Sequence, residues 1–168
     1  MRFEIVHQFD LPLDAVELAV LSPDLFAALA PRLPNIETLK QLSHSVRDGV
    51  FERVWSYRAN VKVPGFARPY VTPEMLGWNE ESSYDLERHS ARWSIVPHAK
   101  PAWRDFFAST GTYRLVPRGD DGSARVIQGD LSLEVPFARQ LAERAILREV
   151  RKAFDAEALA LRDLATLA

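Results

Sequence analysis

The side chains best suited to acid–base chemistry near neutral pH are four histidines: His7, His44, His89 and His98. None of them forms an HExxH or HxH spacing, so we expect no metal site. His7 alternates with Phe3, Ile5 and Phe9 on one face of a predicted strand. We expect it to be either an internally hydrogen-bonded histidine or a histidine that contacts a ligand or acts as an acid–base group.

Signatures of catalysis and nucleotide binding are missing from the sequence. There is no GxSxG elbow, no GxGxxG and no GxxxxGK[ST]. The chain has no cysteine, which excludes disulfides, thiolate nucleophiles and cysteine-based metal sites. We therefore expect no cofactor.

Two arginines, Arg53 and Arg88, fall on the predicted inward faces of strands. A buried guanidinium is costly unless it is paired. Each arginine either pairs with a carboxylate or lies near water at a strand end, or the two form an anchor for a carboxylate or phosphate on a ligand. Tyr57 or Tyr84 could join such an anchor.

The strands also carry more aromatic side chains than a minimal core needs: Trp55, Tyr57, Trp78, Tyr84, Trp93, Phe107 and Tyr113. They either form a packed aromatic core or line a pocket. In the second case, the small residues Gly111 and Gly129 would enlarge the gaps between the rings.

These residues must be positioned by short strands joined by turns. Alternating patterns predict strands at 2–9, 36–46, 50–63, 82–89, 92–97, 106–116 and 125–135, and a further short strand at 75–78. Asp48-Gly49 is a strong hairpin signal, and Ser90-Ala91 is a plausible turn. Two short helices are expected between Ala15 and Ala30.

The longest helical pattern runs from Phe137 to Ala168, without glycine or proline. Ile146, Val150 and Phe154 follow the spacing of one apolar face. This face either packs on the core or lines a ligand cavity. A helix that follows a series of hairpins suits a layer that covers one face of an antiparallel sheet.

The composition predicts a folded domain and argues against a nucleic-acid-binding or integral membrane protein. The chain has 168 residues, 47% hydrophobic and 26% charged, with a net charge of −2, so we expect one folded domain over residues 1–168. The charge balance argues against nucleic-acid binding. No apolar run reaches the length of a membrane span, so we expect no integral membrane association. The first ten residues do not resemble a signal peptide, so we expect a cytoplasmic location. Nothing in the sequence indicates an oligomeric state.

Three segments resemble the START-type helix-grip superfamily, which includes the birch-pollen allergen and polyketide cyclases, and in particular a bacterial branch of it. They are MRFEIVHQFDLPLDAVELAV, VRDGVFERVW and GDLSLEVPFARQLAERAILREV. The resemblance implies an α+β helix-grip fold, in which a curved antiparallel sheet of six to seven strands wraps around a long C-terminal helix, with two short helices after the first strand. It also implies a hydrophobic cavity between the sheet and that helix.

The expected function is binding or transport of a hydrophobic, lipid-like or polyketide-like molecule in this cavity. The alternatives are a cyclase- or hydratase-like enzyme that uses His7 or a tyrosine in the same cavity, and a partner-binding regulatory domain with a filled core. The expected cavity lining is His7, Phe26, Leu29, Arg53, Trp55, Tyr57, Trp78, Tyr84, Arg88, Trp93, Phe107, Tyr113, Leu131, Leu133, Ile146, Val150 and Phe154.

Overall fold

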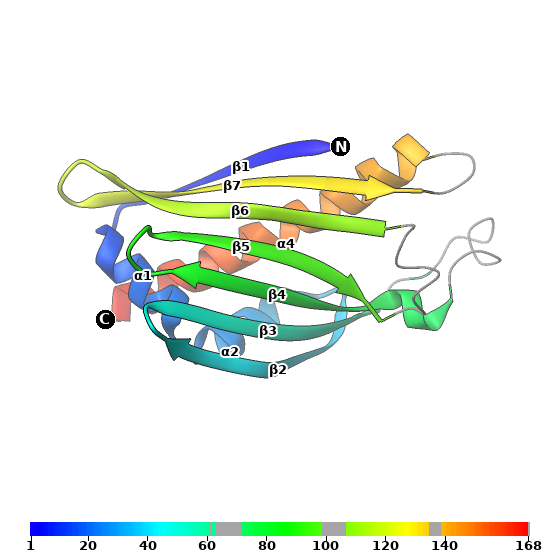
Figure 1. Cartoon of the computed structure of the whole chain (residues 1–168), viewed down its shortest axis with the longest axis horizontal. Helices are drawn as coiled ribbons and strands as arrows, with labels where there is room; N and C mark the ends of the chain where they lie inside the picture. The colour runs from blue at the N-terminus through cyan, green and yellow to red at the C-terminus, as the bar shows by residue number, and fades with distance from the viewer. Residues whose placement is uncertain (61, 63–71, 99–106, 135–138, 168) are drawn as a thin grey trace.

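A computed structural model describes residues 1–60, 62, 72–98, 107–134 and 139–167. This part of the chain contains a seven-stranded antiparallel sheet with strand order β1-β7-β6-β5-β4-β3-β2 (Figure 1). The strands are β1 Arg2–Phe9, β2 Ile36–Arg47, β3 Val50–Ala59, β4 Gly77–Asp85, β5 Ser90–Pro97, β6 Phe107–Arg118 and β7 Gly122–Leu133. The helices are α1 Leu13–Leu21, α2 Leu25–Leu29, α4 Arg139–Leu167 and the 3-10 turns η1 Ala30–Arg32 and η2 Pro73–Leu76. The predicted helix-grip α+β fold is confirmed.

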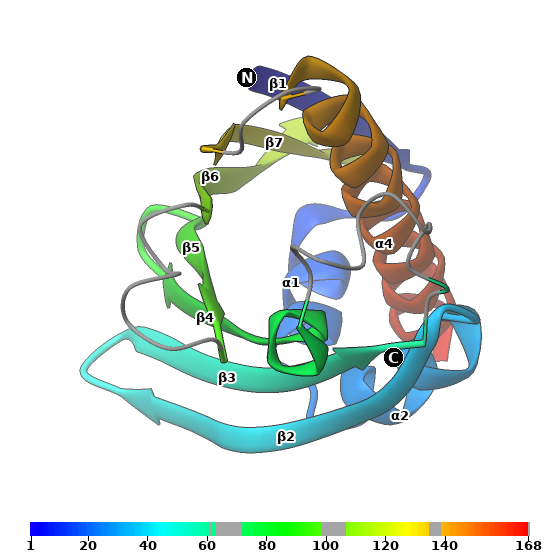
Figure 2. The same ribbon diagram turned by 90° about the vertical axis from the view of Figure 1, so that its right-hand side faces the viewer.

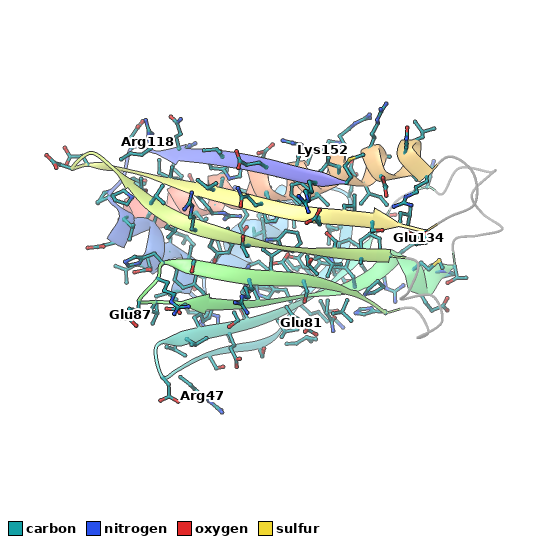
Figure 3. The ribbon with its side chains drawn as sticks, turned by 45° about the horizontal axis from the view of Figure 1, so that its top comes forward. Arg47, Glu81, Glu87, Arg118, Glu134 and Lys152 are labelled. Atoms are coloured by element: carbon teal, nitrogen blue, oxygen red, sulfur yellow. The ribbon has the colours of Figure 1, made fainter. Side chains whose placement is uncertain are left out.

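Hairpin turns connect strands β2 to β3, β4 to β5 and β6 to β7, and all three lie at one end of the sheet (Figure 1). In the first, Asp48 and Gly49 have φ of 50° and 77°. Two consecutive residues with positive φ form the type I′ geometry, which matches the twist of paired strands. Charged side chains at these turns, Arg47, Glu87 and Arg118, point away from the sheet (Figure 3).

The sheet curves so that α1 and α4 face its concave side (Figure 2). β1 is paired with β7, the last strand, so the beginning and the end of the sheet-forming sequence lie together at one edge. α4 lies against α1, α2, β1 and β7. Near its N-terminal end, α4 is connected to β7 by a hydrogen bond of 3.2 Å that the Glu143 carboxylate accepts from the backbone N–H of Leu133. No helix in the described ranges is long and apolar enough to cross a membrane.

The predicted boundaries around β4 were wrong. The expected strand 82–89 and the turn at Ser90-Ala91 are replaced by a strand that ends at Asp85 and a turn over residues 86–89. The Asp85 carboxylate forms this turn by accepting hydrogen bonds of 3.0 Å from the backbone N–H groups of Glu87 and Arg88. His89 completes it with a φ of 49°. The turn contains neither glycine nor proline, so the usual signals did not mark it.

Other boundaries also differ from expectation, and among them β6 extends to Arg118 and β7 begins at Gly122. The strand expected at residues 75–78 is instead the 3-10 turn η2, with β4 starting at Gly77. β3 ends at Ala59, and positions 61 and 63 of the longer expected strand lie outside the described residues. The same holds for residues 137, 138 and 168 of the expected terminal helix, for residue 106 of the strand expected at 106–116 and for residue 135 of the strand expected at 125–135.

Candidate functional site

Four rows of inward-facing side chains cross neighbouring strands in the middle and far part of the sheet, and His7, Arg125 and Leu115 lie closer to the hairpin turns than any of them. The first row consists of Ile5, Ile127, Tyr113, Ala91, Tyr84 and Phe51. The second consists of Phe3, Gly129, Gly111, Trp93, Ser82 and Arg53. The third consists of Leu131, Ser109, Ile95, Glu80 and Trp55. The fourth has two parts, Leu133 with Phe107 and Pro97 with Trp78 and Tyr57, because the pairing of β5 with β6 ends at Ile95 and Ser109.

Burial falls from the first row to the fourth. Every residue of the first row is at most 7% exposed. In the fourth row Leu133, Phe107 and Trp78 are only half-buried. The apolar face of α4 shows the same trend, because Leu161 is fully buried whereas Ile146, Val150 and Phe154 are half-buried. The interior is therefore filled near the hairpin turns and less completely covered beside residues 139–154 of the helix.

A cluster of four charged side chains lies inside the fold: Arg53, Arg125, Glu80 and Glu157. One guanidinium nitrogen of Arg53 lies 3.1 Å from Glu80 Oε1 and 3.3 Å from Glu157 Oε1. Arg125 donates to Glu157 Oε2 at 2.5 Å. Two positive and two negative charges balance, which is the condition under which buried charges persist.

The two carboxyl groups of this cluster differ in their environment. Burial raises the pKa of Glu80, Glu157 adds to this, and Arg53 offsets it only in part, so that the pKa lies above its ordinary value. Burial also raises the pKa of Glu157, but the positive charges of Arg125 and Arg53 lower it by more. The pKa of Glu157 therefore lies below its ordinary value. Glu157 is therefore the firmly ionised member, and Glu80 is the one whose charge the fold disfavours.

Aromatic rings surround the cluster. The guanidinium carbon of Arg53 lies 3.7 Å from the ring centroid of Trp55, and that of Arg125 lies 5.0 Å from the ring of Tyr113. Both contacts have cation–π geometry. Tyr57 donates a long hydrogen bond of 3.4 Å to Glu80 Oε2 and stacks on Trp78 with a centroid distance of 5.3 Å.

Burial is the largest influence on the pKa values of the two tyrosines in contact with the cluster, Tyr57 and Tyr113. It raises the pKa of Tyr57 well above its usual value, with a further contribution from Glu80. It raises the pKa of Tyr113 to about 12, because it outweighs the opposing effect of Arg53 and Arg125. Both phenols are therefore protonated at neutral pH, so they can donate hydrogen bonds but do not serve as bases.

Trp93 occupies the space where the second row has its glycines. A Cβ added to Gly111 would lie 2.5 Å from the Trp93 ring, and one added to Gly129 would lie 2.9 Å from it and 2.4 Å from Phe3. The expectation that these glycines leave open gaps was wrong, because the rings lie directly over them. On its helix side, Trp93 makes an edge contact with Phe154 at 5.6 Å between centroids.

His7 lies on β1 beyond the first row, away from the half-buried side chains. Its Nε2 is 2.9 Å from Asp155 Oδ1, in a groove of about 310 Å³ between β1 and α4. Burial lowers its pKa, the hydrogen bond to Asp155 opposes this in part, and the charge of Arg125 adds to the lowering, so the pKa lies below its usual value. His7 is thus hydrogen-bonded within the chain through Nε2, whereas its buried Nδ1 has no partner among the described residues.

A second polar contact joins α1 to the β4–β5 hairpin. The Glu17 carboxylate accepts a hydrogen bond of 2.5 Å from the Tyr84 hydroxyl, and its Oε1 lies 2.7 Å from His89 Nδ1. Tyr84 is in the first row and is engaged in this contact, so it holds the filled end of the interior together.

The structure places the two arginines predicted to face inward, Arg53 and Arg88, in different environments. Arg53 points inward and is paired with carboxylates, as one of the two hypotheses stated. Arg88 was placed wrongly: it lies in the β4–β5 turn with a side chain 79% exposed, 3.7 Å from Asp85. The error arose because the strand was expected to continue to residue 89, whereas β4 ends at Asp85. Alternation between inward and outward side chains applies only within a strand, so it does not hold for Arg88 in the turn.

The remaining candidate residues fall into two groups. Leu29, Trp55, Tyr113 and Leu131 are almost completely buried, whereas Phe26 is half-buried and makes an edge contact with Trp55 at 6.0 Å between centroids. The half-buried group that faces the less covered part of the interior comprises Trp78, Phe107, Leu133, Ile146, Val150 and Phe154.

Sequence reasoning missed three members of the charged cluster. Arg125 continues the inward pattern of Ile127 and Gly129 backward by two residues. Glu157 stands three residues after Phe154 and four before Leu161, on the apolar face of the helix. Glu80 was missed because β4 was expected to begin at Ser82.

A concavity on the outer face of strands β2 to β5, about 390 Å³, is lined mostly by polar residues, among them Glu52, Glu81, Ser83, Arg92 and Ser94. Four charged residues, Glu52, Arg53, Glu81 and Arg92, line it, and its apolar lining residues are Val54 and Trp93. We therefore do not consider it a site for a hydrophobic ligand.

Comparison with known proteins agrees with this architecture. A family model described as "Protein of unknown function (DUF2505)" matches residues 4–164. No significant match was found among curated protein sequences. The structure is similar to the Zhui aromatase/cyclase from Streptomyces sp. R1128, with a TM-score of 0.66, 15% identity and coverage of 99% of this chain and 93% of that one. It is also similar to norcoclaurine synthase from Thalictrum flavum, with a TM-score of 0.63, 19% identity and coverage of 98% and 86%.

Proposed function

The chain belongs to the DUF2505 family and has the helix-grip fold, and from this premise we propose that it binds a hydrophobic small molecule. The binding region is the interior between the fourth row of the sheet and residues 139–154 of α4. Proteins of this fold are typically hydrophobic ligand binders or cyclases, and the two structural neighbours are named as enzymes. The residues of this chain support binding more directly than they support a reaction.

The observation that carries the proposal is the graded burial of the interior. Trp78 and Phe107 from the sheet, and Ile146 and Val150 from the helix, belong to inward faces and yet remain half-buried. Exposed apolar area costs about 25 cal/mol per Å², so a ligand that covers these side chains gains binding free energy from each of them. The side chains of the first row are already buried, so a ligand would gain no binding free energy by covering them.

Polar groups at the inner boundary of this region would orient the ligand. Glu80 in the third row is 20% exposed on its side chain, more than Arg53, Arg125 or Glu157. Its neighbour Tyr57 keeps its hydroxyl proton at neutral pH. A small number of polar groups in a mostly apolar pocket is the usual composition of a small-molecule site.

Binding of the neutral fluorescent probe N-phenyl-1-naphthylamine tests the proposal. We expect enhanced probe fluorescence with the native chain and at least a tenfold weaker affinity in Ile146→Trp, because the larger side chain fills the interior. The matched control is Leu141→Trp on the same helix, where Leu141 is 67% exposed and the affinity should not change.

Circular dichroism of both variants shows whether the fold is retained. A native chain that fails to bind the probe contradicts the proposal. So does a folded Ile146→Trp variant that binds the probe as tightly as the native chain.

A further inference from the structure

Five buried side-chain atoms have no hydrogen-bond partner among the residues that the structure describes: Nδ1 of His7, Nδ1 of His44, Nε of Arg125, the indole Nε1 of Trp93 and the hydroxyl of Ser109. Of these, Trp93 Nε1 and the Ser109 hydroxyl belong to uncharged side chains in the second and third rows of the interior. Trp93 is 6% exposed and Ser109 is 2% exposed. They lie on the same face of neighbouring strands, because Ile95 is paired with Ser109 and Trp93 precedes Ile95 by two residues. Diagonal neighbours of this kind are about 7–8 Å apart, close enough for both to reach one group.

A buried donor without a partner is unfavourable, and native proteins keep few of them. Neither donor is needed to build this part of the sheet. The contacts of Trp93 with Gly111, Gly129 and Phe154 are made by its ring, and a phenylalanine ring would retain much of that packing. Ser109 lies between Ile95 and Leu131 in an otherwise apolar part of the third row, where alanine would fit.

Both donors border the half-buried region. Phe107 precedes Ser109 by two residues on the same face of β6, and Phe154 touches Trp93 from the helix. The donors are therefore within reach of a molecule that packs on these rings. An oxygen atom of that molecule would satisfy them.

The charges of the interior decide which kind of oxygen fits. Arg53 and Arg125 are already matched by Glu80 and Glu157, so the described cluster has no excess positive charge for an anionic head group. A carboxylate or phosphate buried there would be left without a counter-charge, which is strongly unfavourable. A neutral carbonyl or hydroxyl oxygen carries no such cost.

We propose that Trp93 and Ser109 are the hydrogen-bond donors of the ligand site, and that the ligand is a neutral, ring-containing hydrophobic molecule with a carbonyl or hydroxyl oxygen. This inference rests on the proposed function. It excludes fatty-acid anions and phospholipid head groups from the inner part of the site.

Three probes of the same ring size test the inference: 2-acetylnaphthalene with a neutral carbonyl, 2-naphthoate with an anionic carboxylate, and 2-ethylnaphthalene without oxygen. Dissociation constants are measured by calorimetry, and the indole N–H signal of Trp93 is followed in ¹⁵N-labelled protein. We expect the native chain to bind the ketone most tightly. We also expect the Trp93 indole signal to shift with the ketone more than with the hydrocarbon.

The variants Trp93→Phe and Ser109→Ala should each weaken binding of the ketone by roughly fivefold relative to their effect on 2-ethylnaphthalene, which is the usual effect of one neutral hydrogen bond. Equal affinity of the ketone and the hydrocarbon, unchanged ketone affinity in both variants, or tighter binding of the naphthoate would overturn the inference while leaving the proposed function intact. If none of the three probes binds, the proposed function itself fails.

Stability provides a second readout with a matched control. Ser123 is also fully buried, but its hydroxyl donates a hydrogen bond of 2.9 Å to the carbonyl of Leu11. Ser123→Ala should lower the denaturation midpoint and leave ketone binding unchanged. Ser109→Ala should keep or raise the midpoint, because it removes an unpaired group. A midpoint for Ser109→Ala lowered as far as that for Ser123→Ala would assign Ser109 a structural role and contradict the inference.

Discussion

Arg53 and Glu157 are 104 residues apart in the chain, yet their side chains meet inside the fold at 3.3 Å. Alternation along β3 was sufficient to predict that Arg53 points inward, and a carboxylate partner was one of the alternatives that the cost of a buried guanidinium left open. Which carboxylate it would be could not be predicted, because any of 23 acidic residues could in principle serve. Glu157 was still a detectable candidate, since it interrupts the apolar face of the terminal helix.

Replacement of the two cluster carboxylates should have unequal effects. Glu157→Gln leaves Arg125 and part of Arg53 without a counter-charge and should lower the free energy of unfolding by about 3–5 kcal/mol. Glu80→Gln should cost less than about 2 kcal/mol, because its raised pKa shows that the fold already disfavours its charge and glutamine keeps an acceptor for Arg53. Denaturant unfolding of both variants measures the difference, and equal losses would contradict this assignment.

The two halves of α4 differ in how completely their apolar side chains are buried. Its second half packs against the filled end of the interior, where Ala160 and Leu161 are completely buried. Its first half presents Ile146 and Val150 to the less covered region. The helical period alone marked both halves as one apolar face, and only the opposing layer distinguishes them.

Alanine substitution should separate the two halves. Leu161→Ala removes a fully buried side chain and should reduce the free energy of unfolding by about 3 kcal/mol. Ile146→Ala removes the same number of carbon atoms from a half-buried site, so we expect a loss of about 1 kcal/mol together with a change in probe affinity. Chemical denaturation compares the two. A loss for Ile146→Ala as large as that for Leu161→Ala would indicate that the interior is filled along the whole helix.

The stability of the whole molecule depends on pH through His7. Because the fold lowers the pKa of His7, the unfolded chain binds more protons than the folded chain near and below pH 6.5, the ordinary value for histidine. The contribution of His7 is therefore fully present above pH 6.5 and is lost as the pH falls. Glu80 acts in the opposite direction, since its raised pKa makes its contribution decline as the pH rises above 4.5.

A comparison with His7→Gln isolates this effect, since the glutamine amide can still donate to Asp155. We expect the stability of the native chain to fall relative to the variant when the pH is lowered from 7.5 to 5.5. Unfolding free energies at several pH values give the difference. A constant difference across this range would show that the pKa of His7 is not lowered by folding.

The sequence by itself determined the order of the elements and the faces of most strands, because alternation, turn residues and helical spacing are local properties of the chain. It therefore predicted the inward position of Arg53, the Asp48-Gly49 hairpin and the long terminal helix. It failed at the β4–β5 turn, where the Asp85 side chain takes the place of a glycine or proline signal.

The tertiary structure alone decided which of the inward side chains meet. The pairing of Arg125 with Glu157, the Trp93 ring over Gly111 and the graded burial from the first row to the fourth all depend on how the sheet and α4 approach each other. That approach is set by the packing of side chains distant in the chain, and no local pattern records it.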